Sequence, residues 1–310
     1  MPRATGGDIF AIVVNYQTPE LTISAVEHLR SSELAERRLR VTIVDNNSGD
    51  DSVARLAERF SDMDVIASKR NLGFAGGNNL AIEAALNELA DDVDRHDTFF
   101  LLINSDVNVE REAIATCIAF METHPAVGVV GPKVVLPDGR LDLACRRGFP
   151  TPGRAFWKLT GLAKRFPNNH RFTGYNLTHL DEDTVTEVDA VMGACMLVRL
   201  AAVDAVGLLD DTFFMYGEDI DWAYRIKQRG WRVFYVPTAR VRHLKGATTR
   251  RQSYRMIIEF YRAMWLFHRK HYAGRTIALL NWLVAVGVVT RGIVAIAANA
   301  MRPAGAKRVS

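Results

Sequence analysis

Apolar runs alternate with helix-like segments along the first hundred residues, and this alternation constrains the fold more than any other feature of the sequence. The apolar runs are short and continuous, as expected for strands that are buried on both faces. They lie at residues 9–15, 41–44, 64–67 and 99–103. Helical patterns separate them, so the sequence predicts βαβ units and an α/β fold, with helices on both faces of a mostly parallel sheet.

The pattern changes beyond Gly131. Residues 132–183 contain several Pro, Gly and Arg residues with little periodicity, which predicts a long loop region with short elements. Regular structure is expected again as a strand at 188–198, a helix at 216–230, a strand at 232–241, a helix at 254–271 and an apolar segment at 276–301. We therefore expect an α/β domain over residues 1–247 and a basic, apolar helical extension over residues 248–310.

Polar residues stand where the predicted strands end, which is where open α/β sheets bind ligands. Asp45 begins the sequence D-N-N-S, whose carboxylate and amides can hydrogen bond to a nucleobase or a ribose. The same residue types are ordinary turn formers, so a plain turn is the alternative. The glycine-rich segment 71–79 lets backbone N–H groups approach an anionic group, although a simple strand–helix connection also remains open.

Asn104-Ser105-Asp106 follows the strongest predicted strand. A carboxylate at this place can hold Mg²⁺ or Mn²⁺, which take oxygen ligands and share them with substrate phosphates. His243, at the end of another predicted strand, is the best candidate for a second ligand. A lone histidine is more often structural, and that alternative stays open.

Glu218, Asp219 and Asp221 place three carboxylates within four positions at the start of a predicted helix. Such a group of acids is repulsive unless a cation, a helix N-terminus or a substrate offsets the charge. The acids therefore either cap the helix or supply a general base that takes a proton from a hydroxyl group.

The motifs occur in the order N-Y, D-N-N-S, N-L-G-F-A-G-G-N-N, L-L-I-N-S-D, G-A-C-M-L-V-R, F-F-M-Y-G-E-D-I-D-W and V-R-H-L-K-G. In this order the chain resembles the family 2 inverting glycosyltransferases of the GT-A fold, and among them the bacterial rhamnosyltransferase-like branch. The resemblance covers about residues 8–250, and the combination of motifs is very specific. It implies a GT-A domain that transfers a sugar from a nucleoside diphosphate.

The resemblance also implies roles for individual residues. Asp219 would be the catalytic base, Glu218 would support the base or the acceptor, and Trp222 and Asp221 would border the acceptor sugar. The residues expected to bind the nucleotide sugar are Asn15, Tyr16, Asp45, Asn47, Asn71, Gly77, Asn104 and Ser105. Asp106 would match the last acid of the family's D-x-D metal motif, and His243 would complete the site for Mg²⁺ or Mn²⁺. Asn104 replaces the first acid of that motif, which leaves the number of protein ligands open.

The expected activity is single-displacement transfer with inversion. The expected donor is dTDP-rhamnose, and the expected acceptor is a hydroxyl of a glycan or of a polyprenyl-linked glycan in cell-envelope polysaccharide synthesis. A UDP-hexose donor is the main alternative. A dehydrogenase is disfavoured because no G-x-G-x-x-G follows the first strand. A non-catalytic membrane-binding or nucleic-acid-binding module is a remote alternative.

The charge of the chain is strongly asymmetric. Residues 222–310 hold 18 Lys and Arg residues against one acid, a charge of +17, whereas residues 1–221 carry −13. This split predicts an anionic membrane surface as a partner, and we expect no nucleic-acid partner. A solvated basic helix, or a soluble hairpin on the catalytic domain, is the alternative.

The expected location of the protein in the cell follows from the apolar C-terminal segment, the N-terminal residues and the cysteine content. The apolar segment at 276–301 predicts a helix in the membrane interface or one leaflet. Residues 1–8 lack the apolar stretch of a secretory signal, and the chain has three scattered cysteines. We therefore expect a cytoplasmic protein, peripheral or monotopic at the inner face of the bacterial plasma membrane.

Overall fold

The computed structural model describes residues 7–34, 36–244 and 253–302. Its strands are β1 (Ile9–Asn15), β2 (Leu39–Asp45), β3 (Asp64–Ala67), β4 (Phe99–Asn104), β5 (Val107–Val109), β6 (Val127–Val135), β7 (Arg146–Arg147), β8 (Thr186–Glu187), β9 (Ala190–Val191), β10 (Cys195–Arg199) and β11 (Arg232–His243). Its helices are α1 (Pro19–Arg30), α2 (Ser52–Arg59), α3 (Gly73–Glu88), α4 (Ala113–Thr123), α5 (Pro152–Leu159), α6 (Leu162–Arg165), α7 (His170–Thr173), α8 (Leu200–Val206), α9 (Glu218–Gln228), α11 (Ser253–His271), the short 3₁₀ helix η1 (Ala273–Arg275) and α12 (Ala278–Ala300).

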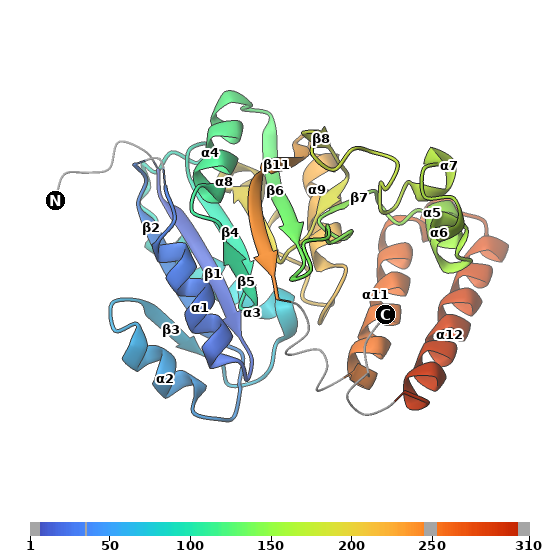
Figure 1. Cartoon of the computed structure of the whole chain (residues 1–310), viewed down its shortest axis with the longest axis horizontal. Coiled ribbons are helices and arrows are strands. Elements are labelled where there is room, and N and C mark those ends of the chain that lie inside the picture. Colours follow the sequence, from blue (N-terminus) through green and yellow to red (C-terminus); the bar gives the residue numbers. More distant parts are fainter. Residues whose placement is uncertain (1–6, 35, 245–252, 303–310) are drawn as a thin grey trace.

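The expected α/β fold is confirmed. In the described part of the chain, one nine-stranded sheet has the order β3-β2-β1-β4-β10-β6-β11-β5, with β8 paired to β11 (Figure 1). Strands β1 to β4 are parallel to their neighbours within this group, and β6 is parallel to β11. Strand β10 runs antiparallel between β4 and β6, so that the sheet is mixed. Strands β7 and β9 form a separate antiparallel ribbon, called the β7–β9 ribbon below.

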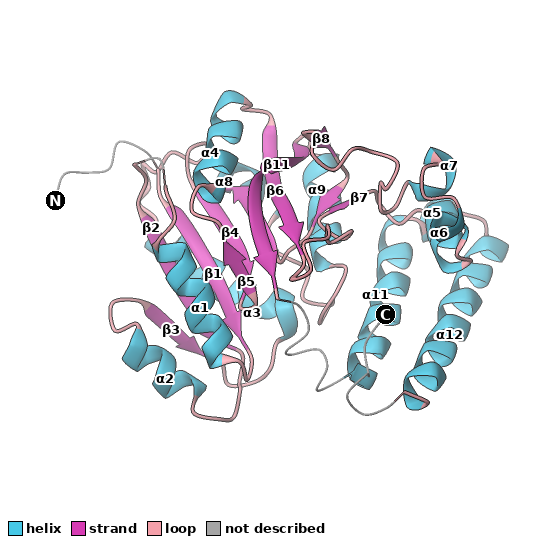
Figure 2. Ribbon diagram, viewed as in Figure 1, coloured by secondary structure: helices cyan, strands magenta, loops and turns pink. Residues whose placement is uncertain are grey.

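Helices cover both faces of this sheet. Helices α1 and α4 lie on one face, and α3, α8 and α9 lie on the other (Figure 2). The central strands β1, β4, β6 and β10 are buried along almost their whole length, which explains their continuous apolar sequences. The strand expected at 188–198 is interrupted, because residues 192–194 separate β9 from β10. The region 132–183 contains short elements as expected, although its first residues still belong to β6.

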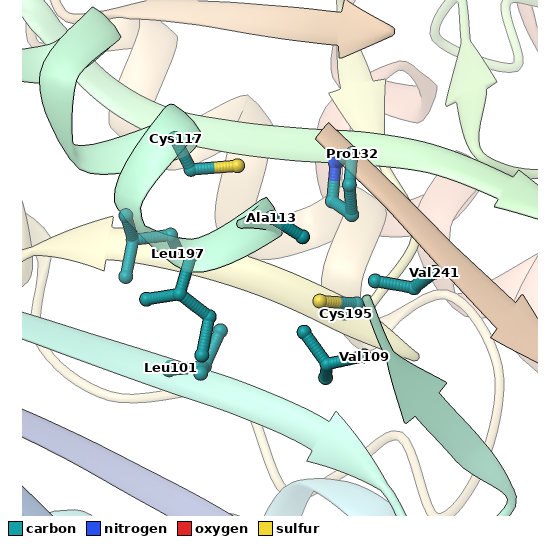
Figure 3. Close-up of a pocket in the computed structure, with 9 residues that line it drawn as sticks. Leu101, Val109, Ala113, Cys117, Pro132, Cys195, Leu197 and Val241 are labelled. Carbon is teal, nitrogen blue, oxygen red and sulfur yellow. The ribbon is translucent and has the colours of Figure 1, made fainter. Parts of the chain in front are cut away.

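A small cavity lies between α4 and the sheet (Figure 3). Its volume is about 10 Å³ and its walls are apolar, with Cys117 and Cys195 among the lining residues. A cavity that holds water needs polar partners, so this one belongs to the hydrophobic core and offers no ligand site. Burial also raises the pKa of both thiols, which makes them unreactive core residues.

The C-terminal helices α11 and α12 pack against each other as an antiparallel pair at one side of the molecule (Figure 1). Helix α11 joins the hydrophobic core of the α/β domain through Ala263 and Phe267. The boundary expected between residues 247 and 248 lies outside the described residues and stays a prediction. Helix α12 has 23 residues and a mean hydropathy of 1.9 over its most apolar window, of which only 6% is buried. By length and composition it is able to cross a membrane.

Asp221 anchors the C-terminal end of α11 to α9. Its carboxylate lies 2.7 Å from His271 Nε2, 2.8 Å from Lys270 Nζ and 2.8 Å from Arg225 Nε, and its side chain has no exposed surface. Burial alone would raise the pKa of this carboxyl, but the bonds from His271, Lys270 and Arg225 outweigh it and lower the pKa to about 2. The carboxylate is therefore ionised at neutral pH and holds two helices together.

We predict that Asp221→Asn destabilises the protein by about 1–3 kcal/mol at pH 7, since it leaves His271 and the partly exposed Arg225 and Lys270 without their counter-charge. The ionised Asp221 stabilises the fold above the pKa of the unfolded chain, near 3.8, and this contribution is lost as the pH falls toward 2. The difference between wild type and variant should therefore shrink between pH 4 and pH 2. Urea unfolding measures it, with Asp211→Asn, at an exposed acid, as the control. Equal stability of Asp221→Asn and wild type at pH 7 would contradict the anchor.

Candidate functional site

The carboxyl ends of β1, β2 and β4 meet at one edge of the sheet. Asn15 pairs with Asp45 in the parallel register, and Asn104 lies opposite Val14. The Asn15 Nδ2 group donates to Asp45 Oδ2 at 2.7 Å, and the Ser48 hydroxyl donates to the same oxygen at 2.6 Å. Asn15 is fully buried and Asp45 nearly so, so these two form the floor of the site. Tyr16, Asn47 and Asn71 retain exposed surface around this floor.

The glycine-rich segment forms the start of a helix. Helix α3 begins at Gly73, whose φ of +71° and whose contact with the Phe214 carbonyl leave no room for a side chain. The backbone N–H groups of Leu72, Gly73 and Phe74 donate to Asn46 Oδ1, Asn71 Oδ1 and the Phe214 carbonyl. These three amides are therefore occupied within the protein.

Gly77 lies further along the same helix. A Cβ atom at this position would lie 3.1 Å from Val14 Cγ1 and 3.4 Å from Asn46 Nδ2. Gly77 thus permits close contact between α3 and β1. Gly77 therefore helps to position the floor of the site by packing against β1, and its direct contact with a nucleotide sugar stays a prediction.

Asp106 and His243 face each other at the same edge. Asp106 Oδ1 lies 3.2 Å from His243 Nε2, and Asp142 Oδ2 lies 3.4 Å from His243 Nδ1. The Leu244 N–H donates to the Asp106 carbonyl at 2.8 Å, which fixes the end of β11 beside the loop after β4. Burial alone would lower the pKa of the His243 imidazole, but Asp106 and Asp142 outweigh it and raise the pKa to about 9.

The donor set of this pair fits a divalent cation. Asp106 offers a carboxylate oxygen and His243 an imidazole nitrogen, with side chains 13% and 8% exposed. The described residues contain no group of three His, Cys, Asp or Glu side chains placed to hold a metal ion. Two protein ligands suit an ion that shares its coordination with substrate phosphates and water. Asp142 stands where a second carboxylate would orient the imidazole ring.

Asp219 lies at the N-terminus of α9 and is held by three donors. Its Oδ2 atom accepts from Arg147 Nη2 at 2.6 Å and from the Gly193 N–H at 2.9 Å, and its Oδ1 atom accepts from the Ile220 N–H at 2.7 Å. Ala194, the residue after Gly193, accepts from the Asn104 N–H at 2.9 Å. Asp219 therefore lies at the same sheet edge as the loop that carries Asp106.

Glu218 differs sharply from its neighbour. The side chain is almost fully buried, and its Oε2 atom has no hydrogen-bond partner among the described residues. Burial, and then repulsion by Asp219, raise the pKa of the Glu218 carboxyl well above its usual range. The two adjacent acids thus have different surroundings: burial favours the protonated form of Glu218, whereas Asp219 is paired with a guanidinium.

Two residues expected at the acceptor do not reach the surface. Trp222 is fully buried and donates from Nε1 to the Gly207 carbonyl at 2.9 Å. Asp221 is fully buried in the anchor described above. Both pack within the protein in this structure, and a role for either at the acceptor stays a prediction. Ser105 is also mostly buried, with its hydroxyl 3.4 Å from that of Thr18.

Sequence analysis did not identify Asp142, Arg147 or Gly193 as site residues. Asp142 and Arg147 lie in the aperiodic region 132–183, where no strand or helix pattern marks a side chain as buried. The structure identifies them because both are buried and paired with distant residues. Asp142 pairs with His243, about a hundred positions away, and Arg147 pairs with Asp219, about seventy positions away. The G-A-C motif around Gly193 was the one sequence signal available for this part of the site.

Known proteins resemble this chain over most of its length. A family model described as "Glycosyltransferase like family 2" matches residues 6–259. An N-acetylglucosaminyl-diphospho-decaprenol L-rhamnosyltransferase of Mycobacterium tuberculosis is 29% identical over 266 residues, which cover 85% of this chain and 85% of that protein.

Solved structures share the fold at low identity. The structure of GalNAc-T7 with UDP, GalNAc and Mn²⁺ matches with a TM-score of 0.57 at 13% identity, over 91% of this chain and 55% of that one. Residues 1–349 of Staphylococcus aureus TarS in complex with UDP-GlcNAc match with a TM-score of 0.54 at 16% identity, over 93% of this chain and 73% of that one.

We predict that Glu218→Gln becomes more stable relative to wild type as the pH rises above 4.5. The unfolded wild type releases the Glu218 proton near that pH, while the folded protein keeps it, so the unfolding free energy of the wild type falls by up to about 1.4 kcal/mol per pH unit. Glutamine does not titrate and escapes this loss. Urea unfolding from pH 4 to pH 8 measures the difference. A difference that stays constant with pH, or that also appears in the exposed control Glu58→Gln, contradicts a buried proton on Glu218.

Proposed function

The chain belongs to glycosyltransferase family 2, and from this premise we propose that it moves L-rhamnose from dTDP-rhamnose to a hydroxyl of a polyprenyl-linked glycan, with inversion. The observation that carries the proposal is that one sheet edge holds both the Asp106–His243 pair and the paired carboxylate of Asp219. The first can face a leaving diphosphate, and the second can face an attacking hydroxyl. A UDP-hexose as donor is the alternative.

The nucleotide would lie over the floor made by Asn15 and Asp45. Tyr16, Asn47 and Asn71 have exposed surface around this floor and are the side chains best placed to contact a base or ribose. The structures of GalNAc-T7 and TarS, which share this fold, contain UDP or UDP-GlcNAc. The Mycobacterium tuberculosis relative, named for rhamnosyl transfer to a diphospho-decaprenol, supports rhamnose and a lipid-linked acceptor.

Asp106 and His243 would hold Mg²⁺ or Mn²⁺ beside the donor diphosphate, with Asn104 nearby. When bound, the ion neutralises charge that develops on the leaving diphosphate. Within the chain, Asp142, 3.4 Å from His243 Nδ1, would orient the ring, and the hydrogen bond from the Leu244 N–H to the Asp106 carbonyl keeps the two ligands together. The Mn²⁺ in the GalNAc-T7 structure supports a divalent ion in this fold.

Asp219 would act as the general base. The acceptor hydroxyl gives its proton to the Asp219 carboxylate, and the acceptor oxygen forms a bond to the anomeric carbon of the donor. The bond from that carbon to the diphosphate oxygen breaks, and its electron pair leaves with the diphosphate. Attack and departure occur on opposite faces of the sugar, so a single displacement inverts the anomeric carbon and requires no covalent enzyme intermediate. Glu218, which keeps its own proton, can donate a hydrogen bond to the acceptor.

We predict that Asp219→Asn abolishes sugar transfer and leaves donor binding largely intact. The amide keeps the shape of the side chain but cannot accept the hydroxyl proton, and loss of a general base lowers the rate by about 10²–10⁴-fold. The assay is nucleoside-diphosphate release from dTDP-rhamnose and a panel of UDP-hexoses, with a polyprenyl-linked acceptor, in the presence of Mn²⁺ or of a chelator.

The wild type should release dTDP in Mn²⁺ and lose most of its rate in the chelator. Asp211→Asn, an exposed acid close to the same helix, should retain full activity. Near-normal turnover of Asp219→Asn would remove this residue from the mechanism. Full activity in the chelator would contradict the proposed role of the metal ion. Release of UDP from a UDP-hexose, with no release of dTDP from dTDP-rhamnose, would show that the donor is a UDP-hexose.

We also propose that α12 holds the enzyme at the cytoplasmic face of a membrane. Trp282, Val289 and Ile293 are 60–62% exposed and recur at helical spacing, so they form one apolar face. The opposite side of α12 contacts α11, where Asn281 Oδ1 lies 2.8 Å from His268 Nε2. Arg291 interrupts the apolar sequence of α12 and is costly at the centre of a bilayer, so α12 would rest in the interface or one leaflet. The basic charge of this segment would attract anionic lipid.

We predict that the combined substitutions Trp282→Glu, Val289→Glu and Ile293→Glu prevent binding to vesicles. Three carboxylates make the apolar face of α12 unfavourable to bury in lipid, and they also repel anionic headgroups. Binding should therefore weaken by at least about tenfold. Flotation with phosphatidylglycerol vesicles measures it, and Val185→Glu, at an exposed apolar residue of the α/β domain, is the control. Equal flotation of the triple variant and wild type, or no flotation of the wild type, would contradict membrane attachment through α12.

A further inference from the structure

Arg147 is the one cation in direct contact with Asp219 among the described residues. Its Nη2 atom donates to Asp219 Oδ2 at 2.6 Å and to the Val191 carbonyl at 2.8 Å, and the side chains of Arg147 and Asp219 are each 9% exposed. The contact therefore lies in a largely water-free place, where a charge-assisted hydrogen bond is strong and geometrically restrictive.

The β7–β9 ribbon supplies this arginine and also a second donor to Asp219. Arg147 pairs with Ala190 in the ribbon, and the chain continues from β9 to Gly193, whose N–H donates to the same Oδ2 atom. Gly193 has to be small, since a Cβ atom there would lie 3.1 Å from Phe74 Cζ and 3.4 Å from Asp219 Cβ. Strand β7 and the segment directly after β9 thus hold the same oxygen of the Asp219 carboxylate.

The hydrogen bonds leave one acceptor position on Asp219. An ionised carboxylate has about four positions for donors, two on each oxygen. Arg147 and Gly193 fill both positions on Oδ2, whereas the Ile220 N–H fills one of those on Oδ1. The remaining position is on Oδ1.

We propose that Arg147 is a positioning residue, which holds Asp219 by Oδ2 and thereby assigns Oδ1 as the atom that receives the acceptor proton. This inference rests on the proposed function and specifies its base at the level of a single atom. The proton of the acceptor hydroxyl forms a bond to Oδ1, and the acceptor oxygen keeps the electron pair with which it attacks the anomeric carbon.

The charges around Asp219 agree with this role. Glu218 on α9 keeps its proton, so it does not compete for the guanidinium. The Tyr175 hydroxyl contacts Arg147, and Lys158 on α5 lies over the Tyr175 ring, with Nζ 4.0 Å from its centre. Desolvation opposes the charge on Arg147, but the attraction of Asp219 outweighs it and raises the pKa of Arg147. Arg147 therefore stays charged at any pH at which the enzyme works.

The test compares Arg147→Gln, Arg147→Lys and wild type in pH profiles of kcat/KM for the acceptor, with donor at saturation. Arg147→Gln should lower kcat/KM by about 10–100-fold at pH 7, and should move the acidic limb of its profile upward by about one to two pH units, because a neutral neighbour no longer favours the ionised carboxylate. Arg147→Lys keeps the charge and should return the limb to within about half a unit of wild type, with a lower kcat because the fork geometry is lost. The KM for the donor should change less than about twofold in both.

Arg154→Gln is the matched control. Arg154 lies in α5, between the two strands of the β7–β9 ribbon in the sequence, and its ion pair with Asp189, at 2.8 Å, does not involve Asp219. Loss of that pair should lower the melting temperature without moving the acidic limb. Melting temperatures of all variants are measured beside the profiles, so that loss of folded protein is separated from a change in the base.

The outcomes separate the inference from the function on which it rests. A wild type that transfers no sugar from any donor overturns the proposed function and the inference with it. A wild type that transfers sugar, with an acidic limb that stays in place in folded Arg147→Gln, overturns the inference alone. A limb that moves equally in Arg154→Gln and Arg147→Gln also overturns it, since the effect is then not specific to the contact with Asp219. If Arg147→Gln does not fold, the pH profile of Arg147→Lys decides. An acidic limb within about half a pH unit of wild type supports the inference, and a displacement of a full pH unit or more overturns it.

Discussion

The first turn of α9 carries three carboxylates in four positions, all of them buried, and much of the structure compensates for their charge. Each acid is stabilised differently. Glu218 keeps its proton, Asp219 takes a guanidinium and two backbone N–H groups, and Asp221 takes three cationic or imidazole side chains. The helix N-terminus favours all three acids. One turn of helix therefore presents a buried acid that favours its protonated form, an acid paired with Arg147, and an ionised acid bound to the C-terminal helices.

The charge asymmetry of the sequence is partly resolved inside the protein. Lys270, near the end of α11, bonds to Asp210 at 2.5 Å as well as to Asp221 at 2.8 Å, so the basic C-terminal part meets acids of the N-terminal part. Part of the charge asymmetry is therefore neutralised by ion pairs between the two parts of the chain, and only the remaining basic charge is available to attract a membrane. The apolar face of α12 points away from this contact and is the stronger argument for attachment to lipid.

The sequence predicted the elements that local patterns control. The runs that became β1 and β4 are apolar because both faces of these strands are covered, and the polar residues after them lie at the edge proposed to bind the ligand. Tertiary contacts controlled the rest. The antiparallel insertion of β10, the guanidinium of Arg147 and the second carboxylate of Asp142 depend on pairings between distant segments. Trp222 and Asp221, which the family resemblance placed at the acceptor, are buried on α9, and their role there stays a prediction.

The anchor and the base share one turn of α9, and this has a mechanical consequence. Asp221 bonds to Lys270 and His271 of α11, while Asp219, two positions earlier, bonds to the β7–β9 ribbon. The turn is thus held from two opposite sides, by the C-terminal helices and by the ribbon. A helix that is fixed at both contacts cannot rotate about its axis without breaking a buried ion pair, which costs about 3–5 kcal/mol. The docking of α11 therefore limits rotation of the turn that carries Asp219, in addition to the contact from Arg147, and it connects the C-terminal helices to the helix that carries the proposed base.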